Sequence, residues 1–152
     1  MSNEITIQPA TENDLPSIKP LLLELMDAMK NTAGFDVEKS IENCRSLIKD
    51  PANHMLVARD KDSILGLVNF TTRKTITHPR PSGLIDELII AKRSRNSGVG
   101  KQLILATINK CREVGCCEVE VSTEKSNIQA RQFYKACGFK EDAVLLEMDI
   151  EE

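Results

Sequence analysis

Apolar and polar residues recur along this chain in two different periods, and the change from one period to the other marks the expected elements. Ile5 and Ile7 alternate with polar neighbours, which predicts a short, half-buried strand. The Thr11–Asp14 segment has the spacing of a capping box and predicts a helix that runs to about Lys30. We expect Pro20 to kink or reset this helix, because proline removes a backbone donor from a helix interior.

A second helix and a hairpin are expected next. Residues 37–49 carry apolar positions at helical spacing. The apolar runs 55–58 and 64–70 flank the polar segment 59–63, which is the pattern of two strands joined by a turn. A near-continuous apolar run then covers residues 84–90, and strands of this kind lie in the middle of a sheet, buried on both faces.

The last third of the chain alternates between helix and strand. An apolar stripe from 99 to 115 predicts a central helix, and residues 117–122 alternate as a strand. Residues 128–136 predict another helix, and the apolar segment 143–150 predicts a last strand. The order is strand, two helices, three strands, helix, strand, helix, strand. It favours an α/β fold in which helices cover a mixed sheet.

Composition and charge restrict the class of protein. A chain of 152 residues has the size of one domain, so we expect residues 1–152 to form a single unit. The N-terminal region has no basic segment leading into an apolar one, which favours a cytoplasmic protein. The net charge of −3 argues against a nucleic-acid scaffold. Five cysteines without C-x-x-C spacing favour reduced packing thiols over a zinc site or a disulfide framework.

The segment Arg95-Asn-Ser-Gly-Val-Gly100-Lys101 lies between a predicted strand and a predicted helix. Unpaired N–H groups at a helix start form an anion site, and glycines let a phosphate approach them closely. A nucleotide-triphosphate P-loop would need glycine in place of Arg95 and Ser or Thr in place of Gln102. A dinucleotide fingerprint would need a small residue in place of Leu103. For the glycine pair taken alone, tight packing of strand against helix is the simplest interpretation.

A second segment changes that interpretation, namely Asn127-Ile-Gln-Ala130-Arg-Gln-Phe133-Tyr134-Lys-Ala-Cys-Gly138-Phe139. With both segments the chain resembles the GNAT superfamily of acyl-CoA-dependent N-acetyltransferases. That family pairs an Arg/Gln-x-x-Gly-x-Gly/Ala phosphate turn with a downstream Asn-x-x-Ala-x-x-Phe-Tyr-x-x-x-Gly-Phe segment. The Glu87-Leu-Ile-Ile90 run is similar to the family's Glu-Leu-x-Val strand, whereas Lys92 stands where the family often has proline. The resemblance covers residues 54–140 specifically and the whole chain in element order.

The resemblance implies a twisted mixed sheet of about six to seven strands flanked by about four helices. The fourth and fifth strands of such a sheet splay apart and admit the pantetheine arm of CoA, while the glycine turn holds the pyrophosphate. Asn127 is expected beside the pantetheine. The cofactor-binding residues expected on this basis are Leu88, Ile89, Ile90, Arg95, Asn96, Ser97, Gly98, Val99, Gly100, Lys101, Asn127 and Tyr134.

The implied reaction is direct attack of an amine on the thioester of acetyl-CoA. An alkylamine with a pKa of about 10 is charged at pH 7, so freeing its lone pair costs roughly 4 kcal/mol and calls for a base. Glu87 is the candidate, with Asp86 or an ordered water as alternatives. Tyr134 matches the family position of the group that protonates the departing thiolate, and it is the chain's single tyrosine.

The expected function is therefore transfer of an acetyl group from acetyl-CoA to a primary amine of a small-molecule or peptide acceptor, without a metal. The alternative is a module that senses acyl-CoA without turnover. Tyr134 and Glu87 favour the enzyme, because a sensor needs neither. The expected partners are acetyl-CoA and the amine, with no nucleic acid or membrane, in a protein that acts alone or as a homodimer. The first two helices and the 73–83 loop are expected to shape the acceptor pocket, whose chemistry these motifs leave open.

Overall fold

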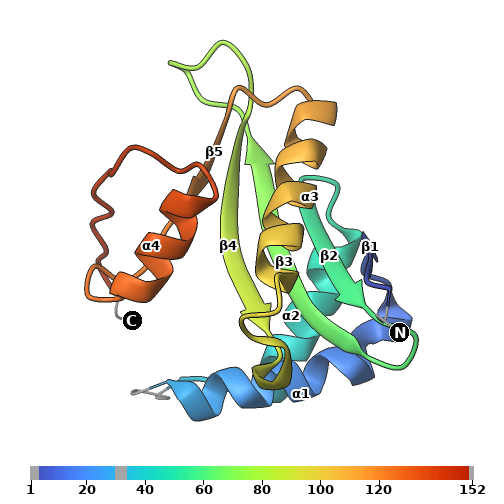
Figure 1. Ribbon diagram of the computed structural model, residues 1–152. Helices are drawn as coiled ribbons and strands as arrows, with labels where there is room; N and C mark the ends of the chain where they lie inside the picture. Colours follow the sequence, from blue (N-terminus) through green and yellow to red (C-terminus); the bar gives the residue numbers. More distant parts are fainter. Residues whose placement is uncertain (1–3, 30–33, 151–152) are drawn as a thin grey trace.

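A five-stranded sheet forms the centre of the molecule (Figure 1). The computed structural model describes residues 4–29 and 34–150. Neighbouring strands are antiparallel from β1 to β4, whereas β5 lies parallel to β4. The sheet order follows the chain: β1 (Thr6–Pro9), β2 (Asn53–Arg59), β3 (Ile64–Arg73), β4 (Ser82–Ile90) and β5 (Glu118–Val121).

Helices cover both faces of this sheet, with α3 in front of it and α2 behind it in Figure 1. One apolar cluster joins α1 and α2 to the sheet and includes Ile18 and Val57. A second cluster, on the α3 side, includes Phe70 and Leu103. The helices are α1 (Leu15–Ala28), α2 (Val37–Lys49), α3 (Val99–Glu113) and α4 (Ile128–Ala136).

The central strands are apolar on both faces because each face has a helical cover. In β2, Met55 and Val57 belong to the cluster under α1 and α2, while Leu56 and Ala58 belong to the cluster under α3. Alternate side chains of a strand point to opposite faces, so a strand between two covers loses the usual polar alternation. The near-continuous apolar runs in the sequence therefore located the middle of the sheet correctly.

Of the kink or reset predicted at Pro20, the reset does not occur, since α1 continues through this residue as one helix. Ile18, Leu21 and Leu22 on either side are buried. Their packing outweighs the single backbone hydrogen bond that proline removes. The predicted helix end near Lys30 lies outside the described residues, and α1 ends at Ala28. No helix within the described ranges is long and apolar enough to cross a membrane.

The predicted strand at 143–150 is wrong, and the sheet has five strands rather than six to seven. Residues 140–150 belong to no helix or strand, and their side chains are exposed. A strand forms only where a neighbouring edge accepts its backbone hydrogen bonds. Asp142 instead forms ion pairs with Lys135 at 3.3 Å and Arg131 at 3.9 Å, which hold the chain beside α4.

Candidate active site

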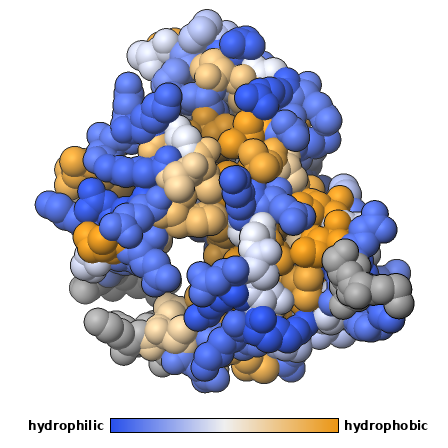
Figure 2. Space-filling view, viewed as in Figure 1, coloured by the Kyte–Doolittle hydropathy of each residue, from blue (hydrophilic) through white to orange (hydrophobic). Residues whose placement is uncertain are grey.

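The free edge of β4 is the main opening in the sheet. β4 and β5 pair only from Ser82–Glu118 to Ile85–Val121. Beyond Ile85, β4 continues to pair with β3 on one side, but among the described residues no strand lies along its other edge. Figure 2 shows the surface hollowed on this side, between α4 and the body of the molecule. This divergence of β4 and β5 leaves backbone N–H and C=O groups free to bind an extended ligand.

A β-bulge in β4 determines where Glu87 points. Asn69 of β3 pairs with Glu87, but Phe70 pairs with Ile85, so Asp86 is an extra residue in β4. An extra residue reverses the alternation of side chains along a strand. Ile85 accordingly packs under α3, whereas Ile89 packs under α1 and α2. Glu87 shares the parity of Ile89 and therefore faces α1 and α2.

Two buried asparagines lead to Glu87 across neighbouring strands. The amide nitrogen of Asn69 donates to Glu87 Oε2 at 3.2 Å. The amide nitrogen of Asn53 on β2 donates to Asn69 Oδ1 at 2.8 Å and to the Leu47 carbonyl at 3.2 Å. Sequence reasoning missed both asparagines. The available signal was that Asn69 interrupts the apolar run of β3, where a buried polar group requires a hydrogen-bond partner.

The pKa values of both carboxyl groups at this site, Asp86 and Glu87, are raised. Although the Glu87 residue as a whole is exposed, desolvation of its carboxyl group raises its pKa, and the negative charge of Asp86 adds to the rise. The hydrogen bond from Asn69 acts in the opposite direction and only partly offsets them. Desolvation also raises the pKa of Asp86. A carboxylate with a raised pKa accepts a proton more readily, which is what a general base requires.

The turn after β4 takes its shape from two residues with positive φ, Asn96 at 62° and Gly98 at 88°. Gly98 precedes the first helical residue, Val99, and no side chain caps the first N–H groups of α3. Residues 95–98 are exposed. Within the described residues, neither Arg95 nor Lys101 forms an ion pair, whereas Arg93 is held by Ser63 Oγ at 2.7 Å. The turn therefore offers free amides and cations at the positive end of a helix.

Gly100 connects this turn to α4. A Cβ atom at Gly100 would lie 3.2 Å from the ring of Phe133, so glycine permits α4 to pack against the first turn of α3. The ring of Phe133 packs edge-on against Tyr134, with 5.2 Å between centroids. The two segments that the sequence singled out are thus brought together through one aromatic contact.

Tyr134 and Asn127 occupy opposite ends of α4. Desolvation raises the pKa of Tyr134, and nearby Cys137 adds to the rise, so the hydroxyl is protonated at neutral pH. Asn127 Oδ1 accepts from the Ala130 N–H at 3.1 Å and caps the helix. Its amide nitrogen is the group left to contact a ligand.

The two regions expected to shape an acceptor pocket lie at different distances from Glu87. The face under α1 and α2 includes Glu87 itself. The loop before β4 instead surrounds a hollow of about 260 Å³ lined by Lys74, His78 and their neighbours. Ser82 begins β4 five residues before Glu87, which corresponds to roughly 16 Å of strand. The loop can therefore reach only the far end of a long acceptor.

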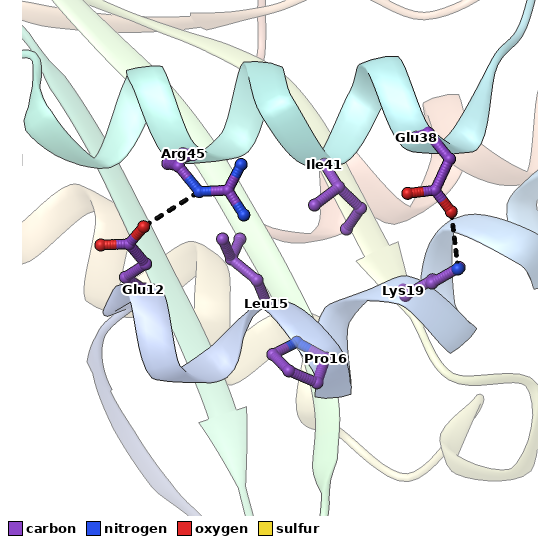
Figure 3. Close-up of a pocket in the computed structure, with 7 residues that line it drawn as sticks. All are labelled: Glu12, Leu15, Pro16, Lys19, Glu38, Ile41 and Arg45. Atoms are coloured by element: carbon purple, nitrogen blue, oxygen red, sulfur yellow. Dashed lines mark hydrogen bonds and ion pairs between the residues drawn. The ribbon is translucent and has the colours of Figure 1, made fainter.

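A separate hollow of about 240 Å³ lies between α1 and α2 (Figure 3). Two ion pairs cross it, Lys19–Glu38 at 2.6 Å and Arg45–Glu12 at 2.9 Å. No residue of β4 or α4 lines it, so it is distinct from the opening beside Glu87. In the part of the chain that the structure covers, no cluster of three or more metal-ligating side chains occurs.

Comparison with known proteins gives the family. The model of the Acetyltransferase (GNAT) family matches residues 16–139, and the chain belongs to this family. An aminoalkylphosphonate N-acetyltransferase of Salmonella typhimurium is 25% identical over 135 residues, which cover 89% of this chain and 84% of the relative. An aminoglycoside N(6')-acetyltransferase type 1 of Stenotrophomonas maltophilia is 31% identical over 65 residues, which cover 43% of this chain and 42% of the relative.

Solved structures agree over nearly the whole chain. A transcriptional regulator from Bacillus halodurans C-125 has a TM-score of 0.84 and 26% identity, covering 97% of this chain and all 100% of that one. An aminoglycoside acetyltransferase from an uncultured soil metagenomic sample, in complex with sisomicin, has a TM-score of 0.78 and 25% identity, covering 97% and 96%. The chain is therefore an acyltransferase of the GNAT type, a class that uses acetyl-CoA as its donor.

Proposed function

We propose that this chain transfers the acetyl group of acetyl-CoA to the primary amine of a small, cationic acceptor, by direct attack in a ternary complex. Glu87 is the base and Tyr134 is the proton donor. The observation that carries the proposal is the position of Glu87. It is hydrogen-bonded to Asn69 at the start of the free edge of β4, and that edge leads directly into the glycine turn.

The donor fits the free edge and the turn together. The backbone of Leu88, Ile89 and Ile90 would pair with the pantetheine amides as an added strand. The exposed N–H groups of the turn would hold the pyrophosphate, and Arg95 and Lys101 would add charge-assisted contacts. Val99 is 1% exposed, so only its backbone can take part. When bound, the thioester supplies an activated acyl group beside Glu87.

Activation of the acceptor falls to the carboxyl group of Glu87. It takes a proton from the ammonium group of the acceptor, which frees the nitrogen lone pair for attack. Its raised pKa strengthens this step, and the Asn69 hydrogen bond fixes the direction of the carboxylate. Tyr134 keeps its proton at neutral pH and can donate it to the departing sulfur.

The relatives support a small amine acceptor, and the site supports a positively charged amine group on it. Asp86 and Glu87 place two carboxyl groups at the opening, which favours a positively charged substrate. The names of two relatives state that they acetylate aminoalkylphosphonates and aminoglycosides, which are both small amines. We extend the class of small amine acceptors to this chain, but we do not assign it either of the relatives' particular substrates.

The test is a substrate panel with direct detection of the acetylated product by mass spectrometry. The panel contains an aminoalkylphosphonate, an aminoglycoside, a polyamine and a lysine peptide, each with acetyl-CoA. We expect a product from at least one small amine and none from the peptide. A product from the peptide alone would refute the small acceptor. Tight CoA binding without any turnover would favour the sensor that the same donor site could serve.

A further inference from the structure

A backbone group between β4 and the glycine turn is held by a helix far away in the sequence. The N–H of Lys92 donates to Glu24 Oε2 at 2.6 Å. Lys92 is the first residue of a single 3₁₀ turn, η2 (Lys92–Ser94), which follows β4, whereas Glu24 lies on α1. In Figure 1 the chain leaves β4 and turns beside α1. A hydrogen bond from a backbone N–H to a carboxylate is one of the stronger kinds in proteins.

The sequence around η2 provides no local partner for this N–H. The preceding residue, Ala91, has extended backbone angles, with φ at −53° and ψ at 136°, and its methyl side chain cannot accept a hydrogen bond. The first N–H groups of a helical turn have no acceptor within the turn and need one from outside it. Glu24 supplies this acceptor from a position 68 residues away. The position of η2 therefore depends on α1.

The next residue of η2 is bound to the hairpin between β2 and β3. Arg93 Nη2 donates to Ser63 Oγ at 2.7 Å and to the Ile64 carbonyl at 3.5 Å. η2 is thus attached to two elements, to the hairpin through a side chain and to α1 through the backbone. Two separate attachments prevent a short turn from rotating about either one, so loss of the contact with Glu24 would free η2 to move.

η2 in turn contacts the glycine turn. Ser94 is buried, and its carbonyl accepts a hydrogen bond from Ser97 Oγ. Ser97 lies between Asn96 and Gly98, the two residues with positive φ that shape the glycine turn. The amide groups expected to bind the pyrophosphate therefore take their position from η2, and through η2 from Glu24.

We propose that Glu24 is a positioning residue of the CoA site, which fixes the glycine turn through the Lys92 N–H without touching the cofactor. This role rests on the proposed function, in which the glycine turn holds the pyrophosphate. The negative charge of Glu24 taken alone would repel a diphosphate bound at the turn. The hydrogen bond and the charge therefore have opposite effects on CoA affinity, and substitutions can separate them.

Position 92 allows the hydrogen bond to be replaced by a covalent constraint. Proline has no N–H and fixes φ near about −65°, which suits the first residue of a helical turn. Proline also requires extended angles at the residue before it, and ψ at 136° in Ala91 meets this requirement. In Lys92→Pro, η2 should keep its shape although Glu24 has lost the N–H that it accepted.

The first experiment is calorimetric titration of the full chain with CoA. Glu24→Leu cannot accept the hydrogen bond and should bind CoA about tenfold more weakly. Glu24→Gln keeps an acceptor oxygen but removes the charge, so it is the matched control and should bind within about twofold of the parent. Unchanged or tighter binding in Glu24→Leu would overturn the proposal. An equal loss in both variants would also overturn it, because the hydrogen bond would then not be the cause.

The second experiment combines Glu24→Leu with Lys92→Pro. Because proline removes the N–H, Glu24→Leu should cost no further CoA affinity in this background. Lys92→Gln is the control, since it removes the same ammonium group but keeps the N–H, and the effect of Glu24→Leu should persist in it. An undiminished effect of Glu24→Leu in the Lys92→Pro background would refute the connection through the Lys92 N–H.

A third measurement needs no CoA. Hydrogen exchange of the free protein should show a Lys92 amide that exchanges slowly in the parent and in Glu24→Gln, and about tenfold faster in Glu24→Leu. A fast Lys92 amide in the parent would overturn the positioning role, whether or not the chain acetylates an amine. If the differences in CoA binding and exchange are found but no acceptor is acetylated, the positioning role stands and the proposed function fails.

Discussion

The amide nitrogen of Asn69 lies 3.2 Å from Glu87 Oε2, across the antiparallel pair of β3 and β4. This hydrogen bond favours the charged form of Glu87, while desolvation and Asp86 favour the neutral form. The balance of these opposing effects sets the pH at which Glu87 can act as a base. Asn53 fixes which end of the Asn69 amide faces Glu87, because it donates to Asn69 Oδ1 at 2.8 Å.

Asn69→Leu should therefore move the acidic limb of the pH–rate profile to higher pH. Removing the hydrogen bond leaves only effects that raise the pKa of Glu87, so deprotonation of the base requires a higher pH. The measurement is kcat/KM against pH for one acceptor. Thr72→Val, further along β3, is the control and should leave the limb in place. An unmoved limb in Asn69→Leu would mean that another group sets it.

Glu87→Gln should lower kcat by about 10²–10⁴-fold, the usual contribution of a general base. CoA affinity should stay within about twofold, because the glycine turn and the β4 edge are unchanged. Single-turnover kinetics and CoA titration measure the two effects separately. Asp86→Asn serves as the comparison: a larger loss in that variant than in Glu87→Gln would transfer the role of base to Asp86.

Tyr134→Phe should lower kcat by about 10²-fold while leaving the thermal midpoint unchanged. Among the described residues no hydrogen bond to the Tyr134 hydroxyl is found, and the ring contacts with Phe133 and Phe139 are kept by phenylalanine. Stopped-flow kinetics and calorimetry report the two quantities. Equal turnover in both proteins would show that water or another group protonates the thiolate.

Gly98→Asp should weaken CoA binding by at least about 100-fold, since it places a carboxylate where the pyrophosphate is expected. Gly98 has φ at 88°, and an added Cβ would meet no atom within 4 Å. The substitution should therefore lower the stability of the fold only through backbone strain, by about 1–2 kcal/mol. Gly115, with φ at 86° and equally open space at the other end of α3, is a matched control. Gly115→Asp should lose at least as much stability, because a carboxylate is disfavoured at the C-terminal end of a helix, and it should keep CoA binding. Isothermal titration and urea unfolding distinguish the two variants.

Asp14→Asn should destabilise the chain by about 2–3 kcal/mol at pH 7, through loss of a largely buried ion pair with Arg59. Burial alone would raise the pKa of Asp14, but the Thr11 N–H and the Arg59 guanidinium more than offset it, so the pKa is lowered. The stabilisation is therefore complete well above the unfolded value of 3.8 and is lost as pH falls through the folded value.

Urea unfolding at pH 7 and near pH 3 tests this dependence. The difference between the parent and Asp14→Asn should narrow at the lower pH. Asp62→Asn, an exposed turn residue, should match the parent at both values. A difference that stays constant with pH would show that Asp14 contributes through packing and not through its charge.

Local sequence patterns predicted the helices and five of the strands because each depends on residues close together in the chain. Helices α2 and α4 match their predicted limits, and Asn127 caps α4 through its side chain. The turn from Arg95 to Lys101 also has the exposed helix start that was expected. The glycine and tyrosine segments were readable for the same reason, since each motif is a short run with its own backbone requirement.

Two features required the tertiary structure. The bulge at Asp86 depends on the register between β3 and β4, and it alone turns Glu87 toward Asn69 and the face of α1 and α2. Residues 143–150 have the alternation of a strand, yet form none within the chain, because pairing requires a vacant edge at the right place in space. Side-chain period and motif spacing are local properties of the sequence. Register and the choice of strand partner depend on residues far apart in the chain, so they were decided only when the sheet assembled.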